Sequence, residues 1–404
     1  MSGDRPGPRV LVVGSGWRFT SGISYYTCRL ANALSTVTPT DVILMRRLVP
    51  RALYPGRSRV GVAVNDLEYD ADIHVYDGVD WFWGRSMRDA RRFVRSQQPD
   101  VVVLQWWTGA VLLSYLNLAR LARRNGARVV MEWHEVQDTG EARIPGVVPY
   151  VRRAIGALLS LVDAHVVHSR YDLELLQAAY RIEETTPDGV SRVTVVPHGP
   201  YDHVNPETPA VPRVSSPDTP FNVLFFGTIR PYKGLEDLVD AFGALPAEAQ
   251  ERMHLTIVGE TWEGWTGPLE SVATSPARDR ITVVNRYVTD AEAREHFAAA
   301  DAVVLPYRRS SASGPLHMAM SAGLPTVVTS VGGLVDAAGD YEGVTFVPPA
   351  DVPSLVEALK GLPAQRDRRY ADPHTWDTTV AAYRSIVGQL DLPVWDMAAN
   401  ATRR

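Results

Sequence analysis

The sequence predicts an α/β protein made of two doubly wound domains, each with a parallel sheet covered by helices on both faces. Short runs rich in Val, Ile and Leu recur along the chain, and segments of helical length separate them. The runs are continuously apolar rather than alternating, which is typical of strands buried on both faces of a parallel sheet. Alternation of such strands with helices is the pattern of doubly wound folds.

Six of these runs lie in each half of the chain. The first six cover residues 9–14, 41–45, 100–106, 128–133, 165–169 and 193–199, and the second six cover residues 222–227, 255–259, 281–288, 301–307, 325–330 and 344–349. Six prolines between residues 199 and 220 break any regular pattern, which indicates an interdomain linker. We therefore expect a first domain over 1–198, a linker over 199–220, a second domain over 221–374, and a last helix with a tail over 375–404. The pattern leaves open whether that helix crosses back to the first domain.

The composition excludes several classes of protein. The chain has 404 residues, 45% of them hydrophobic and 22% charged, as in a soluble globular protein. A net charge of −5 gives no basic surface for nucleic acid. Cys28 is the single cysteine, so no internal disulfide forms, and its helical context predicts a buried thiol. No apolar run is long enough to span a membrane and no signal peptide is recognisable, so we expect a cytoplasmic protein.

The strongest local signal lies in residues 221–242, where a strand is followed by Gly227, the cations Arg230 and Lys233, and an amphipathic helix. This order places fixed positive charge and free backbone N–H groups at the carboxyl end of a strand and the start of a helix. That is a favourable place to hold a diphosphate. An ordinary strand–helix connection with solvated cations is the alternative for this segment taken alone.

Unusual residues gather at the carboxyl ends of the predicted strands, where open parallel sheets bind ligands. In the first half they are Gly14 to Gly16, Trp106, Trp107, His134, Ser169, His198 and Gly199; in the second they are Gly227 to Lys233, Glu260, Arg286, Tyr287, and Tyr307 to Gly314. Two such edges joined by a linker predict a small-molecule site in a cleft between the domains.

Three local patterns suggest other chemistry. Gly14 and Gly16 lack the third glycine of a dinucleotide fingerprint, since Phe19 stands in its place. Asp70 and Asp72 form a possible metal clamp but precede an apparent strand at 73–76, at the opposite end from the cleft, which favours a solvated turn. We therefore expect no metal site. His134 ends a buried strand, and two roles fit it equally: proton transfer at the cleft, or a hydrogen-bonded core histidine.

Over nearly its whole length the chain resembles the retaining glycosyltransferases of family 4, which have the GT-B fold of two Rossmann-like domains. The resemblance rests on residues 226–242, 255–260, 290–307 and 315–334 in the second half, and on residues 21–34, 166–176 and 195–199 in the first. It implies a metal-independent enzyme without a cofactor that moves a sugar from a UDP- or GDP-linked donor. The acceptor would be a glycan, a glycolipid or a small molecule.

The resemblance also implies roles for individual residues. Arg230 and Lys233 match the basic pair that grips the donor diphosphate, and His134 matches the histidine beside the reacting sugar. Gly16 and Gly22 match the ends of a loop near donor and acceptor. The other residues expected at the donor are Gly227, Glu260, Arg286, Tyr287, Tyr307, Ser310, Ser313, Gly314 and Met318, with Arg286 and Tyr287 facing the base.

The chain departs from the family at two of these positions. Most members carry two glutamates eight positions apart where this chain has Ser310 and Met318. A methionine cannot accept hydrogen bonds from ribose hydroxyls, so the inference of a particular donor is weakened. Residues 311–314 still offer serine hydroxyls and the start of a helix. A non-catalytic GT-B partner subunit that binds a nucleotide sugar or a glycan is the alternative function.

Two features of the first half concern the acceptor side. Trp106 and Trp107 are expected to divide between core and cleft wall, because a strand alternates its faces. The segment 84–98 predicts a helix with arginines on one face, at Arg85, Arg88, Arg92 and Arg95, and apolar residues on another. Such a helix can lie on an anionic membrane surface, so peripheral membrane contact is one interpretation. A solvated surface helix is the other.

Overall fold

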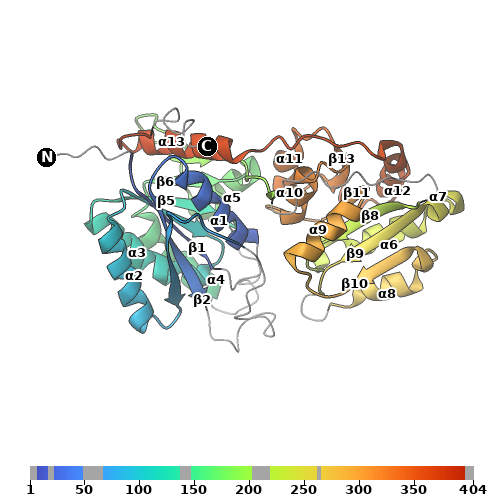
Figure 1. Ribbon diagram of the computed structural model, residues 1–404, viewed down its shortest axis with the longest axis horizontal. Coiled ribbons are helices and arrows are strands. Elements are labelled where there is room, and N and C mark those ends of the chain that lie inside the picture. Colours follow the sequence, from blue (N-terminus) through green and yellow to red (C-terminus); the bar gives the residue numbers. More distant parts are fainter. Residues whose placement is uncertain are drawn as a thin grey trace. The chain divides into compact units, whose positions relative to one another are not determined.

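The computed structural model describes residues 7–16, 22–48, 67–136, 147–202, 219–261 and 265–395. These residues form two compact units. One contains residues Met1–Gly199 and Thr375–Arg404, and the other contains Pro200–His374. Most of the predicted linker lies outside the described residues. The last helix belongs to the first unit, and Figure 1 shows it in red among the elements that carry the blue-to-green colours.

The first unit has a seven-stranded sheet in the order β3-β2-β1-β4-β5-β6-β7, and all of its pairs are parallel. The strands are β1 (Val10–Ser15), β2 (Thr40–Arg47), β3 (His74–Asp80), β4 (Val101–Trp106), β5 (Arg128–Trp133), β6 (Ala164–Val167) and β7 (Val193–Val195). All six runs predicted for this half form strands. The added β3 is an edge strand and only partly buried, which explains its polar composition.

Helices cover both faces of this sheet. On one face α1 (Gly22–Ser35) and α13 (Trp376–Gln389) pack in a cluster that includes Tyr26, Trp376 and Tyr383. The helices on the other face are α2 (Gly84–Gln97), α3 (Leu112–Arg124), α4 (Val147–Leu159) and α5 (Arg170–Tyr180), with a short helix η3 (Gly109–Val111) before α3. Cys28 is buried in α1, and burial raises the pKa of its thiol to about 12, in agreement with the predicted unreactive thiol.

The second unit has a six-stranded parallel sheet in the order β10-β9-β8-β11-β12-β13. Its strands are β8 (Phe221–Phe226), β9 (Met253–Val258), β10 (Ile281–Val284), β11 (Ala302–Leu305), β12 (Thr326–Thr329) and β13 (Val344–Val347). Its helices are α6 (Leu235–Gly243), α7 (Ala247–Arg252), α8 (Gly267–Thr274), α9 (Asp290–Ala299), α10 (Gly314–Ser321), α11 (Gly333–Ala338) and α12 (Val352–Gly361), with short helices η6 (Pro231–Lys233), η8 (Arg278–Arg280) and η9 (Leu362–Gln365). The two predicted doubly wound folds are confirmed.

Both sheets reverse their strand order at one point, between β1 and β4 in the first unit and between β8 and β11 in the second. In doubly wound sheets the connections on either side of such a point leave in opposite directions, so a crevice opens beyond the carboxyl ends of the two strands. The residues that follow β8 and β11 are therefore the first place to look for a ligand site.

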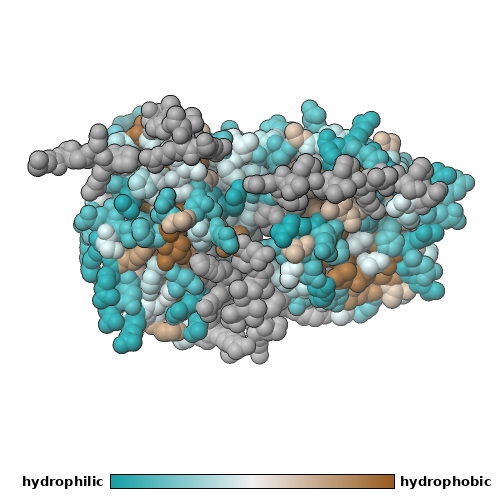
Figure 2. Space-filling model, viewed as in Figure 1, coloured by the Kyte–Doolittle hydropathy of each residue, from teal (hydrophilic) through white to brown (hydrophobic). Residues whose placement is uncertain are grey.

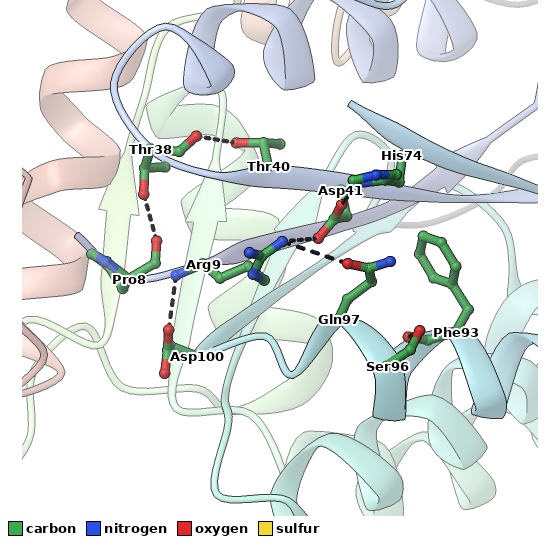
Figure 3. Close-up of polar contacts among 10 residues, drawn as sticks. All are labelled: Pro8, Arg9, Thr38, Thr40, Asp41, His74, Phe93, Ser96, Gln97 and Asp100. Carbon is green, nitrogen blue, oxygen red and sulfur yellow. Dashed lines mark hydrogen bonds and ion pairs between the residues drawn. The ribbon is translucent and has the colours of Figure 1, made fainter. Parts of the chain in front are cut away.

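A polar network fixes the opposite, amino-terminal end of the first sheet (Figure 3). Asp41 is buried, and its carboxylate accepts hydrogen bonds from the Arg9 guanidinium at 3.0 Å and lies 3.0 Å from Nδ1 of His74. The backbone N–H of Arg9 donates to Asp100 at 2.8 Å. These contacts tie β1, β2, β3 and the start of β4 together, so they are structural. Asp70 and Asp72 are exposed and flank a turn before β3, as expected.

The surface in the view of Figure 2 is largely hydrophilic over both units, with apolar side chains in small groups. Among the described helices, none combines the length and the apolar character needed to cross a bilayer.

Candidate functional site

The candidate ligand site of the second unit begins at Gly227, directly after β8. Its φ of 115° lies in the region that favours glycine. A Cβ atom at this position would lie 2.9 Å from Nζ of Lys233 and 3.2 Å from Cγ of Pro315. The missing side chain thus lets the Lys233 ammonium reach the turn, next to the start of α10. This is the point where the strand order reverses.

Lys233 is a buried cation, with 8% of its surface exposed. Its Nζ donates to the hydroxyl of Tyr307 at 3.1 Å and lies 4.8 Å from the centroid of that ring. Burial lowers the pKa of Lys233, the charge of the nearby Arg230 lowers it further, and Tyr232 acts in the opposite direction. Within the described part of the chain no carboxylate forms an ion pair with Lys233. The positive charge is therefore held in the protein without an anion of its own.

A buried carboxylate does lie in the first turn of α6, but another residue neutralises it. Asp237 accepts two hydrogen bonds from the guanidinium of Arg308, at 2.6 and 3.0 Å. The backbone N–H of Arg308 donates to the carbonyl of Tyr232 at 2.7 Å, which fixes this pair beside the segment that carries Lys233. Since a buried charge without a partner is unfavourable, the arrangement around Lys233 fits an anionic ligand.

The start of α10 adds to the positive potential of this site. Ser313 caps the helix, accepting from the backbone N–H of Leu316 at 3.3 Å, and its hydroxyl donates to that of Tyr307 at 3.4 Å. Gly314 then opens the helix, whose first N–H groups and dipole favour a negative group. The site therefore joins a cation, a phenol hydroxyl and a helix start.

The other predicted donor residues lie at varied positions. Glu260 is beside the turn, because its carbonyl accepts from the N–H of Ile229 at 2.8 Å. Arg286 and Tyr287 follow β10 as expected, but the Arg286 guanidinium is paired with Glu292, at 2.6 and 3.1 Å. This bond raises the pKa of Arg286 and, together with bonds from Thr289, lowers that of Glu292 to about 2. Arg286 is thus fixed at the start of α9, so a nucleotide base would meet an ion pair there.

The two positions that depart from the family pattern serve local structure. The Ser310 hydroxyl donates to the carbonyl of Ala312 at 2.8 Å, which closes the turn before α10. Met318 is buried within α10, with 7% of its surface exposed. Neither position supplies a charged acceptor for ribose hydroxyls.

The first unit carries a second polar group, centred on Glu132 near the end of β5. Its buried carboxylate accepts from the Tyr26 hydroxyl at 2.7 Å and from Nε2 of Gln105 at 3.0 Å. Burial raises the pKa of Glu132 to about 7, and the interactions with Tyr26, Gln105 and Tyr383 oppose that shift. These contacts join α1, β4 and β5 on the face of the sheet that α13 also covers.

Three histidines surround the ring of Tyr26 in this group. The ring centroids of His134, His168 and His198 lie 4.7, 5.3 and 4.3 Å from that of Tyr26. Burial lowers the pKa of His134 well below its usual range, with a further contribution from His168, and it lowers that of His168 to about 4. His134 and His168 are therefore neutral at pH 7. His134 is thus buried like a core histidine and also lies at a candidate site. The sequence presented these two properties as alternatives.

His168 and Glu132 are the residues that the sequence analysis did not select. His168 follows β6 directly, as His134 follows β5, so its place at a strand end was the available signal. Glu132 lies inside a strand, where its charge is unusual, and its neighbours Gln105 and Tyr26 come from elements distant in sequence. Only the assembled sheet brings them together.

The predicted acceptor-side residues have different environments in the structure, some in the core and others nearer the surface. Trp106 is 2% exposed and packs against Trp133 with ring centroids 5.7 Å apart, so it belongs to the core. Its neighbour Trp107 is half-buried against Tyr115 and remains the candidate wall residue. Gly16 is buried after β1, and its carbonyl accepts from the Ser24 hydroxyl at 2.8 Å. Gly22 begins α1, and the loop between the two glycines, 17–21, lies outside the described residues.

Both units are Rossmann-like, and in the second the buried cation Lys233 lies where the strand order reverses. These features place the fold of this chain in the GT-B class. Residues 220–364 match the family model described as glycosyl transferases group 1. The match covers most of the second unit, and it agrees with the resemblance read from the sequence.

Comparisons with known proteins agree with this assignment. The D-inositol 3-phosphate glycosyltransferase of Geodermatophilus obscurus is 28% identical over 230 residues, which are 52% of this chain and 50% of that protein. The GDP-mannose:glycolipid 4-beta-D-mannosyltransferase of Xanthomonas campestris pv. campestris is 32% identical over 156 residues, 38% of this chain and 42% of the relative. The matches thus span half or less of these relatives' length. The structure of Anabaena HepE in complex with UDP-glucose has the same fold, with a TM-score of 0.59 over 98% of both chains at 13% identity.

Proposed function

We propose that this chain is a retaining glycosyltransferase that moves a sugar from a UDP- or GDP-linked donor to a glycan, a glycolipid or a small molecule. The observation that carries the proposal is the buried ammonium of Lys233, which has no carboxylate partner among the described residues and lies at the start of α10. A diphosphate supplies the missing negative charge. The relatives named after GDP-mannose and the HepE complex with UDP-glucose support a nucleotide sugar of either base as the donor.

In this proposal Lys233 and Arg230 act on the leaving group. The bond between the anomeric carbon and the phosphate oxygen breaks through an oxocarbenium-like state, and negative charge grows on the diphosphate. Two cations already in place stabilise that charge without rearranging. The acceptor oxygen forms the new bond on the same face of the sugar, and the leaving phosphate oxygen takes the acceptor proton. His134 of the first unit would contact the sugar as a neutral imidazole.

The same arrangement supports transfer without a metal ion or a cofactor. Enzymes that bind a diphosphate through Mg²⁺ use carboxylate ligands. At this site the buried carboxylate of Asp237 is committed to Arg308, while Lys233 is a buried cation. We therefore propose that Lys233 and Arg230 take the part that a divalent cation plays in other transferases.

The helix α2 supports a further proposal, that the first unit contacts an anionic membrane surface. Met87, Ala90 and Val94 are buried, so the apolar face of this helix packs inward, as expected for a surface helix. Trp81 and Phe82, just before the helix, are 48% and 52% exposed. Next to them a cavity of about 510 Å³ is lined by Trp83, Gly84, Met87, Arg88, Arg91, Arg95 and Asn117. Exposed aromatic rings beside clustered guanidinium groups suit a layer of anionic headgroups, and they favour this interpretation over a purely solvated helix.

Release of nucleoside diphosphate from UDP- and GDP-sugars tests the enzymatic proposal. The full chain should hydrolyse its donor slowly without an acceptor, and EDTA should not lower the rate. Lys233→Met, which removes the charge and keeps the length of the side chain, should lower turnover about 100- to 1,000-fold. Lys360→Met is the matched control, because the Lys360 side chain is exposed and paired with Glu357.

Two outcomes would count against the proposal. Full turnover by Lys233→Met would remove the role assigned to this cation. Tight binding of a donor with neither hydrolysis nor transfer, across a panel of acceptors, would favour the non-catalytic partner subunit, an alternative that the absence of both glutamates at Ser310 and Met318 keeps open.

A further inference from the structure

Three histidines converge beyond the carboxyl ends of three neighbouring strands in the first unit. His134 follows β5, His168 follows β6 and His198 comes three residues after β7. Trp133 pairs with Val167 and Val167 with Val195, so the residues that follow these strand ends lie side by side. Adjacent strands are about 4.8 Å apart, and the ring centroids of His134 and His168 are 4.8 Å apart. One nitrogen of each histidine lies within 4.8 Å of the others, and all three residues are buried.

Hydrogen bonds on the far side of two of these rings define which nitrogen faces the group. Nδ1 of His168 lies 3.0 Å from the carbonyl of Val196, and Nδ1 of His198 lies 3.2 Å from that of Gly199. A carbonyl only accepts, so each Nδ1 carries the hydrogen. In a neutral ring this leaves the lone pair on Nε2. Metal-binding imidazoles are commonly oriented by such a bond to a backbone carbonyl.

Two of the nitrogens in this group are buried without a hydrogen-bond partner among the described residues. Nε2 of His134 and Nε2 of His168 are buried, and no donor among the described residues reaches either atom. The carboxylate of Glu132 lies 3.8 Å from the first and 4.0 Å from the second. It accepts hydrogen bonds from Tyr26 and Gln105, and the Tyr383 hydroxyl also interacts with it. A buried polar atom without a partner is unfavourable, and the lone pair on Nε2 of His168 beside a carboxylate attracts a cation.

We propose that His134, His168 and His198, with Glu132 as the fourth ligand, form a binding site for a transition-metal cation of the Zn²⁺ class. Three imidazoles and one carboxylate match the ligands and the coordination number that zinc prefers, whereas Mg²⁺ and Ca²⁺ select oxygen. Zinc–nitrogen bonds of about 2.0–2.1 Å place ligand nitrogens about 3.3 Å apart. The rings must therefore close from their present spacing by rotation of the side chains.

All four ligands of this site belong to the first unit, whereas Lys233 of the proposed diphosphate site belongs to the second. The proposal does not depend on the enzymatic function. It has one consequence for that function: an ion bound to Nε2 of His134 would withdraw this atom from a sugar. Zn²⁺ is then expected to inhibit the transferase and EDTA to restore it.

Metal binding to the chelator-stripped full chain tests the site. After addition of Zn²⁺ and gel filtration, elemental analysis should find one zinc per chain, and Co²⁺ should give the intense visible bands of four-coordinate cobalt. His168→Gln and His198→Gln should each weaken zinc binding at least about 100-fold, a loss as large as those seen even for residues that only orient ligands. His165→Gln is the matched control. It is also a buried histidine of β6, but its ring contacts Trp133, which belongs to the core on the other face of the sheet.

Two further measurements keep the test decisive if a variant folds poorly. Thermal unfolding should show that Zn²⁺ stabilises the wild-type chain and the His165→Gln variant but not His168→Gln. X-ray absorption at the zinc edge of the wild-type protein should show nitrogen and oxygen ligands with the multiple-scattering pattern of imidazole. A folded wild-type chain that retains no zinc would overturn the proposal. Zinc that stays bound in both ligand variants, or a spectrum with a sulfur ligand, would overturn it equally.

Discussion

At the scale of single residues, the two lysines of the sequence occupy opposite environments. Lys360 lies on the exposed side of α12, 2.9 Å from the carboxylate of Glu357, whereas Lys233 is buried against Tyr307. The remaining basic side chains of this chain are arginines and histidines. A lysine changes its protonation state on burial more readily than an arginine, and its compact charge suits a phosphate oxygen. Gly227 supplies the space for it.

The unpaired charge of Lys233 predicts an unusual stability profile. Lys233→Met should leave the free energy of unfolding of the ligand-free protein unchanged or raise it by about 1 kcal/mol, because replacement of a buried charge by an apolar side chain is often neutral or stabilising. The same variant should lose the stabilisation by UDP or GDP. For the wild type this amounts to about 2.7 kcal/mol at a ligand concentration of 100 times Kd. Urea unfolding with and without nucleotide measures both quantities.

Lys360→Met is the control for that comparison. It removes an exposed ion pair, so it should change stability by less than about 1 kcal/mol and keep the response to nucleotide. If Lys233→Met were strongly destabilised without ligand, the charge of Lys233 would have a partner within the protein, and the argument for an anionic ligand would fail.

At the scale of secondary structure, the helix α2 carries the proposed contact with an anionic membrane surface. Arg88→Glu combined with Arg92→Glu should reduce binding to vesicles that contain anionic lipid at least about 100-fold, because each cation near such a surface contributes about 1 kcal/mol and the reversal changes four charges. Co-sedimentation at low and at moderate salt measures this loss. Arg252→Glu with Arg278→Glu makes the same change in net charge on exposed residues of the second unit. If both double variants bound the vesicles equally well, α2 would be a solvated surface helix without membrane contact.

Much of the element order was predictable from the sequence. All twelve apolar runs form strands, because burial on both faces of a parallel sheet leaves a continuous apolar signal. The edge strand β3 was visible only as a short apparent strand, since one side of it is partly solvated. The basic helix and the cations after β8 were also found, because each depends on spacing within a single segment.

The contacts between distant segments were not predictable in the same way. The convergence of His134, His168 and His198 depends on β5, β6 and β7 being neighbours, which is a property of the topology. Strand alternation predicted that Trp106 and Trp107 point to opposite sides. Which of the two enters the core depends on the helices that pack there. The burial of Lys233 depends on the missing side chain at Gly227 and on Tyr307, more than seventy residues along the chain.

At the scale of the whole molecule, the chain begins and ends in the same unit. The helix α13 follows the second unit in sequence but packs with α1 on the first sheet, where Trp376, Tyr383 and Ile386 are buried. The first unit is therefore completed only after the second has been synthesised. The last helix is part of its core and contacts the face that carries Glu132 and the three histidines.

Ile386→Ala tests this dependence. Ile386 is 1% exposed, and removal of a fully buried isoleucine side chain to alanine should lower the stability of the first unit by about 2–5 kcal/mol. Differential scanning calorimetry should show a lower transition for that unit, while UDP or GDP still stabilises the second. Ser385→Ala, on the exposed side of the same helix, should have almost no effect. An unchanged transition in Ile386→Ala would show that α13 does not contribute to the core.

The most direct test of the diphosphate site is the titration of Lys233 by NMR in protein labelled with ¹³C-lysine, where Lys360→Met assigns the two ε-carbon signals. We predict a lowered pKa for Lys233 in the free protein and a rise in that pKa when UDP or GDP is bound, with no change at Lys360. Because binding then favours the protonated form, the affinity for nucleotide should fall as the pH rises above the lowered pKa. A Lys233 signal that titrates like that of Lys360, with and without nucleotide, would contradict the assignment of this residue to the diphosphate.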